Sequence, residues 1–354
     1  MTLYPNLIRE ALKTVTYAGT KKNLIDSQMV GDDIVIDGMK VRLTLIFPRD
    51  TDPFLRSTVK ATEAAIHYHI SPEVEVEVLT EFLSTPRPKS EKMLAGAKHI
   101  IAVSSGKGGV GKSTVSANLA IALARLGYRV GLLDADIFGP SMPKMFGVED
   151  ARPYGVEKDG RTLIEPIERY GVKLLSIGFF VDPKTATIWR GGMATSAVKQ
   201  LLGDADWGDL DYFILDTPPG TSDIHLTLLQ SLDITGAVIV TTPQPVALAD
   251  ARKGIDMYRN EKVQVPILGL VENMAWFTPE ELPDNRYYIF GRDGGKALAA
   301  EYGVPLLGQL PLVQSVREQG DDGDPAALHA DSPMGQAFLG LAQAVVTIVR
   351  KNER

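Results

Sequence analysis

The stretch SSGKGGVGKST, residues 104–114, constrains the fold of this chain more tightly than any other part of the sequence. It fits the phosphate-loop pattern G-x-x-x-x-G-K-[ST], with the first glycine at Gly106 and the lysine at Lys112. The apolar run HIIAVSS precedes the loop and STVSANLAIALARLG follows it, which predicts a strand, a loop and a helix in that order. Glycines let successive backbone N–H groups face phosphates, and the helix N-terminus adds the positive end of its dipole. We therefore expect a nucleotide site; the alternative is a glycine turn without a ligand.

The loop carries two lysines, although a simple phosphate loop needs one. Lys112 is expected to reach the β- and γ-phosphates, and the Ser113 hydroxyl to ligate Mg²⁺. Lys107 lies at the outer edge of the loop, where a cation is placed to reach a nucleotide bound by a second subunit. The alternative for Lys107 is an exposed lysine that adds only diffuse charge. The residues expected to hold the nucleotide are Gly106, Lys107, Gly108, Gly109, Val110, Gly111, Lys112, Ser113 and Thr114.

From His99 onward, apolar runs alternate with helical segments. Several runs are almost continuously apolar, which is typical of strands buried on both faces of a parallel sheet. The pattern predicts an α/β fold with a doubly wound, mostly parallel sheet. The expected strands are HIIAVSS (99–105), RVGLLDAD (129–136), DYFILDT (211–217), AVIVTTP (237–243), ILGLVEN (267–273) and PLLGQLP (305–311).

The first part of the chain has a different pattern, typical of a small α+β domain. Asp37-Gly38 predicts a tight hairpin turn, because such turns need positive φ, and the strand after it alternates apolar and polar residues. A helix over 54–69 and a strand over 74–78 are expected next. The stretch 84–99 contains two prolines and several charges, which indicates a linker. We therefore predict an α+β domain over 1–85, a linker over 86–98 and a phosphate-loop domain over 99–354.

Three carboxylates follow predicted strands, at the end of a parallel sheet where ligands bind. Asp136, in LLDADIFGPSMP, is expected to orient the attacking water. Asp134 is a secondary candidate, and its alternative role is to cap the loop that follows. Asp216 ends the apolar run FIL and is expected to join the magnesium shell, the pattern of a Walker B strand. In the turn after it, Gly220 is expected to offer its N–H to the γ-phosphate, whereas His225 could contact this loop.

Asn273, near a later strand end, is a candidate for binding the base of the nucleotide. Asn273, in VENMAWF, carries an amide that can pair with an adenine edge through its donor and its acceptor. The alternative is an asparagine that caps a turn. Pro311, in LLGQLPLV, is ambiguous by itself.

The composition excludes several classes of function. The 354 residues contain no cysteine, which excludes disulfides, thiolate catalysis and cysteine-ligated clusters held by this chain alone. The net charge of −7 provides no broad basic field, so we expect neither nucleic acid nor a membrane as partner. The longest apolar runs are far too short to cross a bilayer, and a cytoplasmic location is expected.

The motifs resemble those of a known group of proteins. SSGKGGVGKST is similar to the deviant Walker A motif of the MinD/ParA-type P-loop ATPases, in which the first lysine contacts the ATP of the partner subunit. Residues 95–350 resemble the Mrp/ApbC family of iron–sulfur cluster carrier ATPases. The segments before them are similar to the MIP18-like (DUF59) domain. The resemblance to the carrier family is carried by SSGKGGVGKST, LLDADIFGPSMP, LDTPPGTSD, TTPQPVALADARKG, VENMAWF and LLGQLPL.

This resemblance implies a homodimeric ATPase that uses ATP and Mg²⁺ and carries an iron–sulfur cluster to apo-proteins. It implies catalytic roles for Lys107, Lys112 and Asp136, and magnesium binding by Ser113 and Asp216. It also implies that Asn273 and Pro311 surround the base.

The sequence departs from this family at one segment. Family members usually carry a C-x-x-C pair soon after the ENM segment, but here the chain reads FTPEELPDNRYYIFG, residues 277–291. The ATPase reading is therefore well supported, whereas the usual cluster ligands are missing. A ParA/MinD-like regulatory or positioning ATPase, which controls a protein, membrane or DNA partner, is the alternative.

Overall fold

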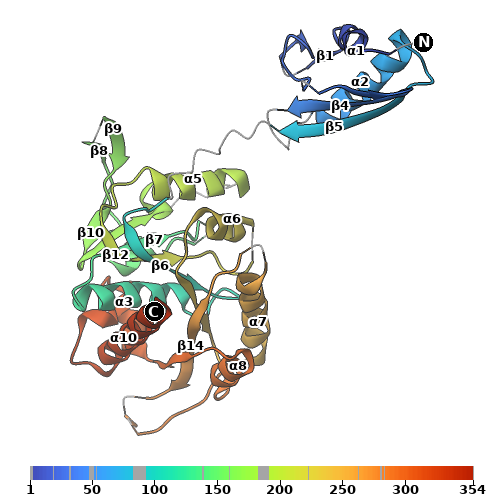
Figure 1. Ribbon diagram of the computed structural model, residues 1–354. Coiled ribbons are helices and arrows are strands. Elements are labelled where there is room, and N and C mark those ends of the chain that lie inside the picture. Colours follow the sequence, from blue (N-terminus) through green and yellow to red (C-terminus); the bar gives the residue numbers. More distant parts are fainter. Residues whose placement is uncertain are drawn as a thin grey trace. The chain divides into compact units, whose positions relative to one another are not determined.

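The computed structural model describes residues 3–82, 93–181 and 191–353, except for 19, 32, 48–51, 53, 138, 159, 222, 262, 280 and 283 (Figure 1). The chain divides into two compact units, residues 1–91 and 92–354, and each unit has its own apolar core. Most of the predicted linker lies outside the described residues. Ala97 and Lys98, assigned to that linker from the sequence, instead begin the first strand of the second unit.

The first unit is a three-stranded sheet covered by two helices. Its sheet has the order β3-β4-β5, with β3 antiparallel and β5 parallel to β4. Gly38 closes the hairpin with a φ of 60°, as the Asp37-Gly38 pair predicts. The alternating apolar side chains of β4 are buried in the core. The elements are α1 (Pro5–Leu12), β1 (Thr16–Tyr17), β2 (Lys22–Asn23), β3 (Val35–Asp37), β4 (Lys40–Phe47), α2 (Leu55–His69) and β5 (Glu75–Phe82).

The second unit is built on an eight-stranded sheet. Every neighbouring pair of strands is parallel except β10 and β11, and all six predicted strands are present. The prediction missed β10, β11 and a separate hairpin of β8 (Gly155–Lys158) and β9 (Arg161–Ile164). In spatial order the sheet is β10 (Ile167–Arg169), β11 (Val172–Ser176), β7 (Val130–Asp134), β12 (Leu210–Asp216), β6 (Ala97–Ser104), β13 (Gly236–Thr241), β14 (Ile267–Phe277) and β15 (Leu306–Leu312).

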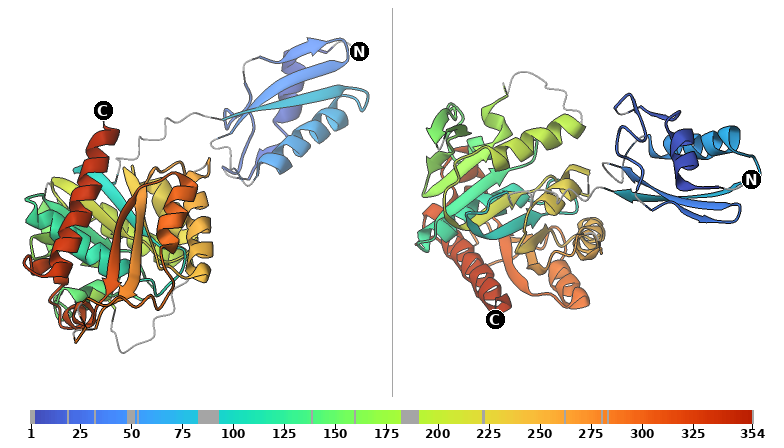
Figure 2. Two further views of the ribbon diagram at one scale, coloured as in Figure 1. Left: turned by 90° about the horizontal axis from the view of Figure 1, so that it is seen from below. Right: turned by 45° about the horizontal axis from the view of Figure 1, so that its top comes forward.

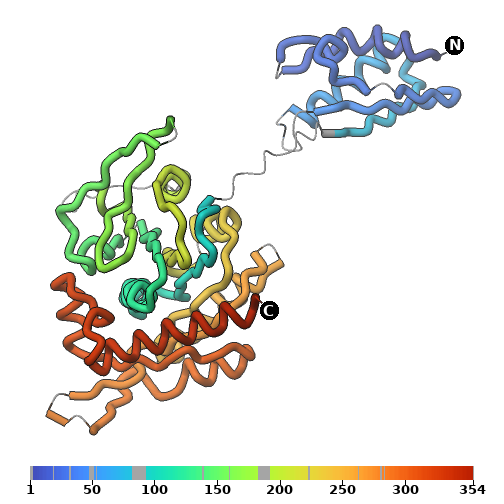
Figure 3. Tube along the Cα trace, turned by 60° about the vertical axis from the view of Figure 1, so that its left-hand side comes forward, coloured from blue at the N-terminus to red at the C-terminus, as the bar shows by residue number. Residues whose placement is uncertain are grey.

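Helices cover both faces of this sheet (Figure 2). On one face lie α3 (Lys112–Arg125) and α10 (Pro333–Asn352), which pack beside each other (Figure 3). The other face is covered by α5 (Gly191–Gly203), α6 (Asp223–Ser231), α7 (Pro245–Arg259) and α8 (Gly294–Tyr302). This is the doubly wound arrangement expected from the sequence. Within the described part of the chain, none of the helices combines the length and the apolar character needed to cross a membrane.

The parallel strands bring the candidate residues to one edge. Because β6, β7, β12, β14 and β15 all point the same way, their carboxyl ends meet there. Two short helices follow strands at this edge, α4 (Met142–Met145) after β7 and α9 (Gln314–Asp321) after β15. The remaining described elements are the 3₁₀ turns η1 (Ile177–Phe179) and η2 (Ala326–Leu328).

Candidate functional site

The glycine loop connects β6 to α3, which begins at Lys112. Gly111 has a φ of 81°, and a Cβ added there would lie 2.2 Å from Nδ2 of Asn273. A Cβ on Gly106 would lie 2.2 Å from the carbonyl oxygen of Asp250 on α7. Both positions therefore require glycine, the first for its backbone conformation and both for close packing. The loop packs closely between β14 and α7, and this packing limits the movement of the loop.

A buried ion pair joins Lys112, at the end of this loop, to Asp216, at the end of β12. Nζ of Lys112 is 2.8 Å from Oδ1 of Asp216, with the two side chains 6% and 0% exposed. The Ser113 hydroxyl donates to Asp216 Oδ2 at 2.7 Å, and the Ser116 hydroxyl donates to Oδ1 at 2.6 Å. Asp216 thus has its oxygens paired with an ammonium group and two hydroxyls, so the buried charge is compensated. Carboxylate and hydroxyl oxygens at this spacing are ligands suited to Mg²⁺.

Asp134 organises the segment that follows its own strand. Its carboxylate accepts from the backbone N–H groups of Asp136, Ser141 and Met142, at 3.2, 3.1 and 3.2 Å, and from the Ser176 hydroxyl at 2.9 Å. Burial and the negative charge of Asp216 raise the pKa of Asp134 to about 7. The geometry fits the capping role, the alternative weighed for this residue. Asp136 is partly exposed and lines a hollow of about 200 Å³ beside the glycine loop.

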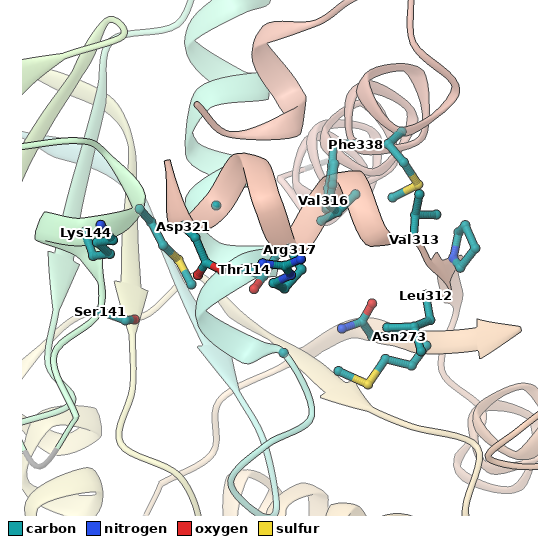
Figure 4. Close-up of a pocket in the computed structure, with 16 residues that line it drawn as sticks. Thr114, Ser141, Lys144, Asn273, Leu312, Val313, Val316, Arg317, Asp321 and Phe338 are labelled. Carbon is teal, nitrogen blue, oxygen red and sulfur yellow. Dashed lines mark hydrogen bonds and ion pairs between the residues drawn. The ribbon is translucent and has the colours of Figure 1, made fainter. Parts of the chain in front are cut away.

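A second cavity, of about 310 Å³, adjoins the loop on the side of β14 and β15. Asn273 and Pro311 line it, as do Gly111 and Thr114 of the loop. Figure 4 shows Arg317 and Asp321 of α9 on one side of this cavity and Asn273 on another. Asn273 is nearly buried and uses one amide hydrogen to donate to the Val110 carbonyl at 2.9 Å. The remaining walls are mostly apolar and include Met145, Met274, Leu312, Val313, Val316, Met334 and Phe338.

The two lysines of the loop differ in their surroundings. Lys112 is buried and paired, whereas Lys107 is partly exposed. Among the described residues, the Lys107 ammonium group makes no hydrogen bond or ion pair. Only its backbone carbonyl is engaged, as acceptor from the Ser105 hydroxyl at 2.9 Å.

The Gly220 N–H, predicted to serve the γ-phosphate, has a partner within the chain in this structure. Its N–H donates to the Ser105 carbonyl at 3.0 Å, so it is turned toward the strand before the glycine loop. Its carbonyl oxygen lies 2.9 Å from Nδ1 of His225, which is fully buried. Both backbone polar groups of Gly220 therefore have partners, because the loop folds back onto β6 and α6.

Sequence reasoning missed three polar residues of this site: Ser116, Ser176 and Tyr258. The spacing of Ser116, three residues after Ser113 on a helix, could have indicated that both face Asp216. Nothing local identified Ser176 or Tyr258, because their partners Asp134 and His225 lie 42 and 33 residues away.

A backbone bridge closes the segment that stands in place of the expected C-x-x-C pair. Phe277 and Tyr287 form an antiparallel bridge, with N–H···O distances of 2.8 and 2.9 Å. The Arg286 guanidinium lies 4.3 Å from the ring centre of Trp276. In the part of the chain that the structure describes, no three histidine, aspartate or glutamate side chains are grouped to hold a metal ion. Backbone pairing and a cation–π contact therefore hold the described parts of this segment.

Comparison with protein-family models identifies both units. Residues 96–346 match the ParA model, described as NUBPL iron-transfer P-loop NTPase. Residues 6–78 match a model described as iron-sulfur cluster assembly protein. The first match covers well over half of the chain.

Individual proteins agree with these matches. The iron-sulfur cluster carrier protein of Synechocystis sp. is 42% identical over 348 residues, which cover 97% of either chain. The protein of the same name from Salmonella typhimurium is 52% identical over 260 residues, 73% of this chain and 69% of that one. A solved structure of a nucleotide-binding protein from Archaeoglobus fulgidus in complex with ADP is 36% identical, with a TM-score of 0.59. It covers 70% of this chain and 95% of its own.

Proposed function

The chain belongs to the ParA-type family described as NUBPL iron-transfer P-loop NTPases, and on that premise we propose that it binds and hydrolyses ATP. The observation that carries the proposal is the buried cluster of Lys112, Ser113 and Asp216 below the glycine loop. An ammonium group, a hydroxyl and a carboxylate are the three groups that a phosphate-loop enzyme needs beside the β- and γ-phosphates. The adjoining cavity of about 310 Å³, with Asn273 in its wall, would take the adenine base.

The residues of this site would act by positioning and by charge. Lys112 would leave Asp216 for the β- and γ-phosphates, while the hydroxyls of Ser113 and Ser116 keep the carboxylate solvated. Mg²⁺, held by Ser113 and by Asp216 through water, would neutralise charge on the phosphate oxygens. Asp136 would orient the attacking water from the hollow beside the loop. The Asp134 carboxylate would keep Asp136 in place by accepting a hydrogen bond from the backbone N–H of Asp136.

Completion of the site would require a second copy of the chain. Lys107 is partly exposed and its ammonium group makes no polar contact among the described residues, which suits a cation that serves another subunit. Placed on the partner's nucleotide, it would stabilise charge that develops during phosphoryl transfer. We therefore propose a homodimer with two ATP molecules at its interface.

The cellular role that we propose is iron–sulfur cluster assembly or transfer, in the cytoplasm, to apo iron–sulfur proteins. Relatives named iron-sulfur cluster carrier protein match the chain, and the first unit matches an iron-sulfur cluster assembly model. The cluster would be cargo, and this chain has no cysteine to hold it. Imidazole and carboxylate groups do not make an ordinary thiolate-held cluster, so a partner protein would supply the sulfur ligands.

A second candidate function is a regulatory or positioning ATPase of the ParA/MinD kind. The absence of cysteine favours it, because such a switch needs no cluster ligands. Its ATP state would control binding to a protein, membrane or DNA partner.

One experiment separates the two functions. The purified protein is incubated anaerobically with ferrous iron and sulfide, with and without ATP, and then with an apo-enzyme that needs a cluster. The same mixture is repeated with a cysteine-containing scaffold protein. Cluster transfer that needs ATP and the scaffold is expected. Absence of transfer in both mixtures, together with ATP-dependent pelleting on vesicles or DNA, would favour the switch.

A further inference from the structure

A buried histidine beside the nucleotide site has no role in the function proposed above. His225 lies in the first turn of α6, just after the loop 217–221 that follows Asp216. It is 0% exposed, with Nδ1 2.9 Å from the Gly220 carbonyl oxygen and Nε2 2.9 Å from the Tyr258 hydroxyl. A carbonyl oxygen can only accept, so Nδ1 carries the proton and donates to Gly220. In a neutral ring Nε2 must then accept, and the Tyr258 hydroxyl is its donor.

The neutral state of this ring follows from its surroundings. Burial lowers the pKa of His225 to about 4, while the bond to Gly220 raises it and the charge of Lys112 lowers it further. The direction of both hydrogen bonds is therefore fixed near neutral pH.

Both ends of this hydrogen-bonded chain touch the nucleotide site. At one end, Gly220 has a φ of 78° and its N–H donates to the Ser105 carbonyl, next to the glycine loop. At the other end, the Tyr258 hydroxyl also interacts with the side chains of Ser104 and Thr217. Ser104 is the last residue of β6, and Thr217 follows Asp216. A movement of the loop 217–221 therefore cannot leave His225 and Tyr258 unchanged, because buried polar groups must stay paired.

Helix α7 is the element that a movement of the loop 217–221 would displace. It carries Tyr258 and presses its backbone against Gly106, whose added Cβ would lie 2.2 Å from the Asp250 carbonyl oxygen. The outer sides of α6 and α7 form a surface hollow of about 610 Å³, lined among others by Leu226, Lys253 and Met257. A shift of α7 against α6 therefore changes the surface of the protein.

We propose that His225 is a positioning residue that links the loop after Asp216 to helix α7, by holding the Gly220 carbonyl and the Tyr258 hydroxyl together. Through this link, the presence or loss of the γ-phosphate is passed from the loop 217–221 to α7 and to the surface between α6 and α7. The inference rests on the proposed ATPase function. It adds a route by which the nucleotide bound at the site changes the conformation of α7 and of the surface between α6 and α7.

The test uses the full-length protein and three variants. His225→Asn keeps a donor for Gly220 and loses the bond to Tyr258, while Tyr258→Phe loses only a hydroxyl. Tyr212→Phe is the matched control, because Tyr212 is also buried but lies at the opposite end of β12. Nucleotide affinity, turnover and amide hydrogen exchange are measured with ADP and with a non-hydrolysable ATP analogue. Thermal melting confirms that each variant is folded.

In the wild type, exchange in both 217–221 and α7 is expected to differ between the two nucleotides. In His225→Asn and in Tyr258→Phe, the difference in α7 is expected to vanish while that in 217–221 remains. Affinity stays within about twofold and turnover falls about fivefold to tenfold, the effect of one lost buried hydrogen bond. The double variant is expected to be no worse than either single variant, because both cut the same link.

A spectroscopic measurement tests the same link without substitution. Imidazole ¹⁵N shifts of His225 at pH 7 are expected to show the neutral tautomer protonated at Nδ1. The Nε2-protonated tautomer would overturn the proposal, as would an unchanged α7 response or additive losses in the double variant. A wild type that binds no nucleotide contradicts the proposed ATPase instead, and that binding is measured first.

Discussion

The two ends of the proposed nucleotide cleft are built from different kinds of interaction. At the phosphate end, defined as Gly106–Ser113 with Asp134, Asp136 and Asp216, the charged groups of Lys112, Asp134 and Asp216 are buried and already have partners. The base end, defined as the cavity around Asn273 and Pro311, is mostly an apolar surface whose charged side chains, such as Arg317, stand near its rim. In the proposed nucleotide site, one end would recognise charge and the other would recognise shape.

This difference sets where binding energy is concentrated. Charge-assisted hydrogen bonds in a buried site are worth more than apolar contacts with one aromatic base. Substitutions at the phosphate end should therefore cost more affinity or turnover than substitutions at the base end.

The largest effect is expected for Lys112→Ala. The charge-assisted bonds that Lys112 would make to phosphate are lost, and Asp216 keeps its two hydroxyl donors but loses its buried counter-charge, so ATP affinity should fall on the order of 1000-fold. Isothermal titration with a non-hydrolysable analogue measures it. Lys144→Ala, at the edge of the base-end cavity, is the control and should change affinity by less than about threefold. Similar losses in the two variants would break the comparison.

Lys107→Ala is expected to separate binding from turnover. ATP affinity should stay close to the wild type, because this ammonium group makes no polar contact among the described residues of its own chain. Turnover should fall about 100-fold or more, as for loss of a cation supplied in trans. The assay is phosphate release over a range of protein concentrations, where wild-type turnover per chain rises as dimers form. A variant that retains more than half of the turnover would contradict the role in trans.

Buried groups at and beside the phosphate end should also make stability depend on pH. The pKa of His225 is about 4 in the folded protein, against a usual value of 6.5, so only the unfolded chain takes up this proton between those values. Stability from this group is present above pH 6.5 and is lost as pH falls toward 4, by about 2 kcal/mol between pH 7.5 and pH 5. Asp134, with its raised pKa, contributes in the opposite direction.

The His225 contribution is isolated by comparing the wild type with His225→Asn. Denaturant unfolding is followed by tryptophan fluorescence at pH 7.5, 6 and 5, since all three tryptophans lie in the second unit. The difference in unfolding free energy between the two proteins should shrink as pH falls. A difference that does not change with pH would show that His225 takes up its proton equally in both states.

The smallest effect is expected at the base end. Asn273→Ala removes the bond to the Val110 carbonyl and one polar group of the cavity, so ATP affinity should fall about tenfold. The preference for ATP over GTP should fall with it, measured by competition binding. Asn285→Ala, in the exposed segment after β14, should change neither quantity. A loss as large as that of Lys112→Ala would remove the distinction between the two ends.

Much of the fold could be predicted because its strands are buried on both faces. β12 and β13 read as continuous apolar runs, and every residue of β13 is buried. β11 was missed, since its short run Val172–Ser176 is no stronger than a buried loop or helix segment. Its strand character comes from parallel pairing with β7, 42 residues earlier. The absence of the C-x-x-C pair was visible at once, whereas the Phe277–Tyr287 bridge that closes that segment was not.

The sequence by itself determined that a phosphate loop lies between a strand and a helix, and that its charged side chains are Lys107 and Lys112. The spacing of the glycines and the positive charge of the lysine side chains are set by the local sequence and do not depend on distant parts of the chain. Only the tertiary structure decided that Asp136 faces the hollow and that Asp134 is enclosed. The two residues are two positions apart in the sequence, but they meet different neighbours. The tertiary structure also decided that His225 joins Gly220 to Tyr258. Desolvation and hydrogen bonding depend on what packs around a group, and that is set by contacts far apart in the sequence.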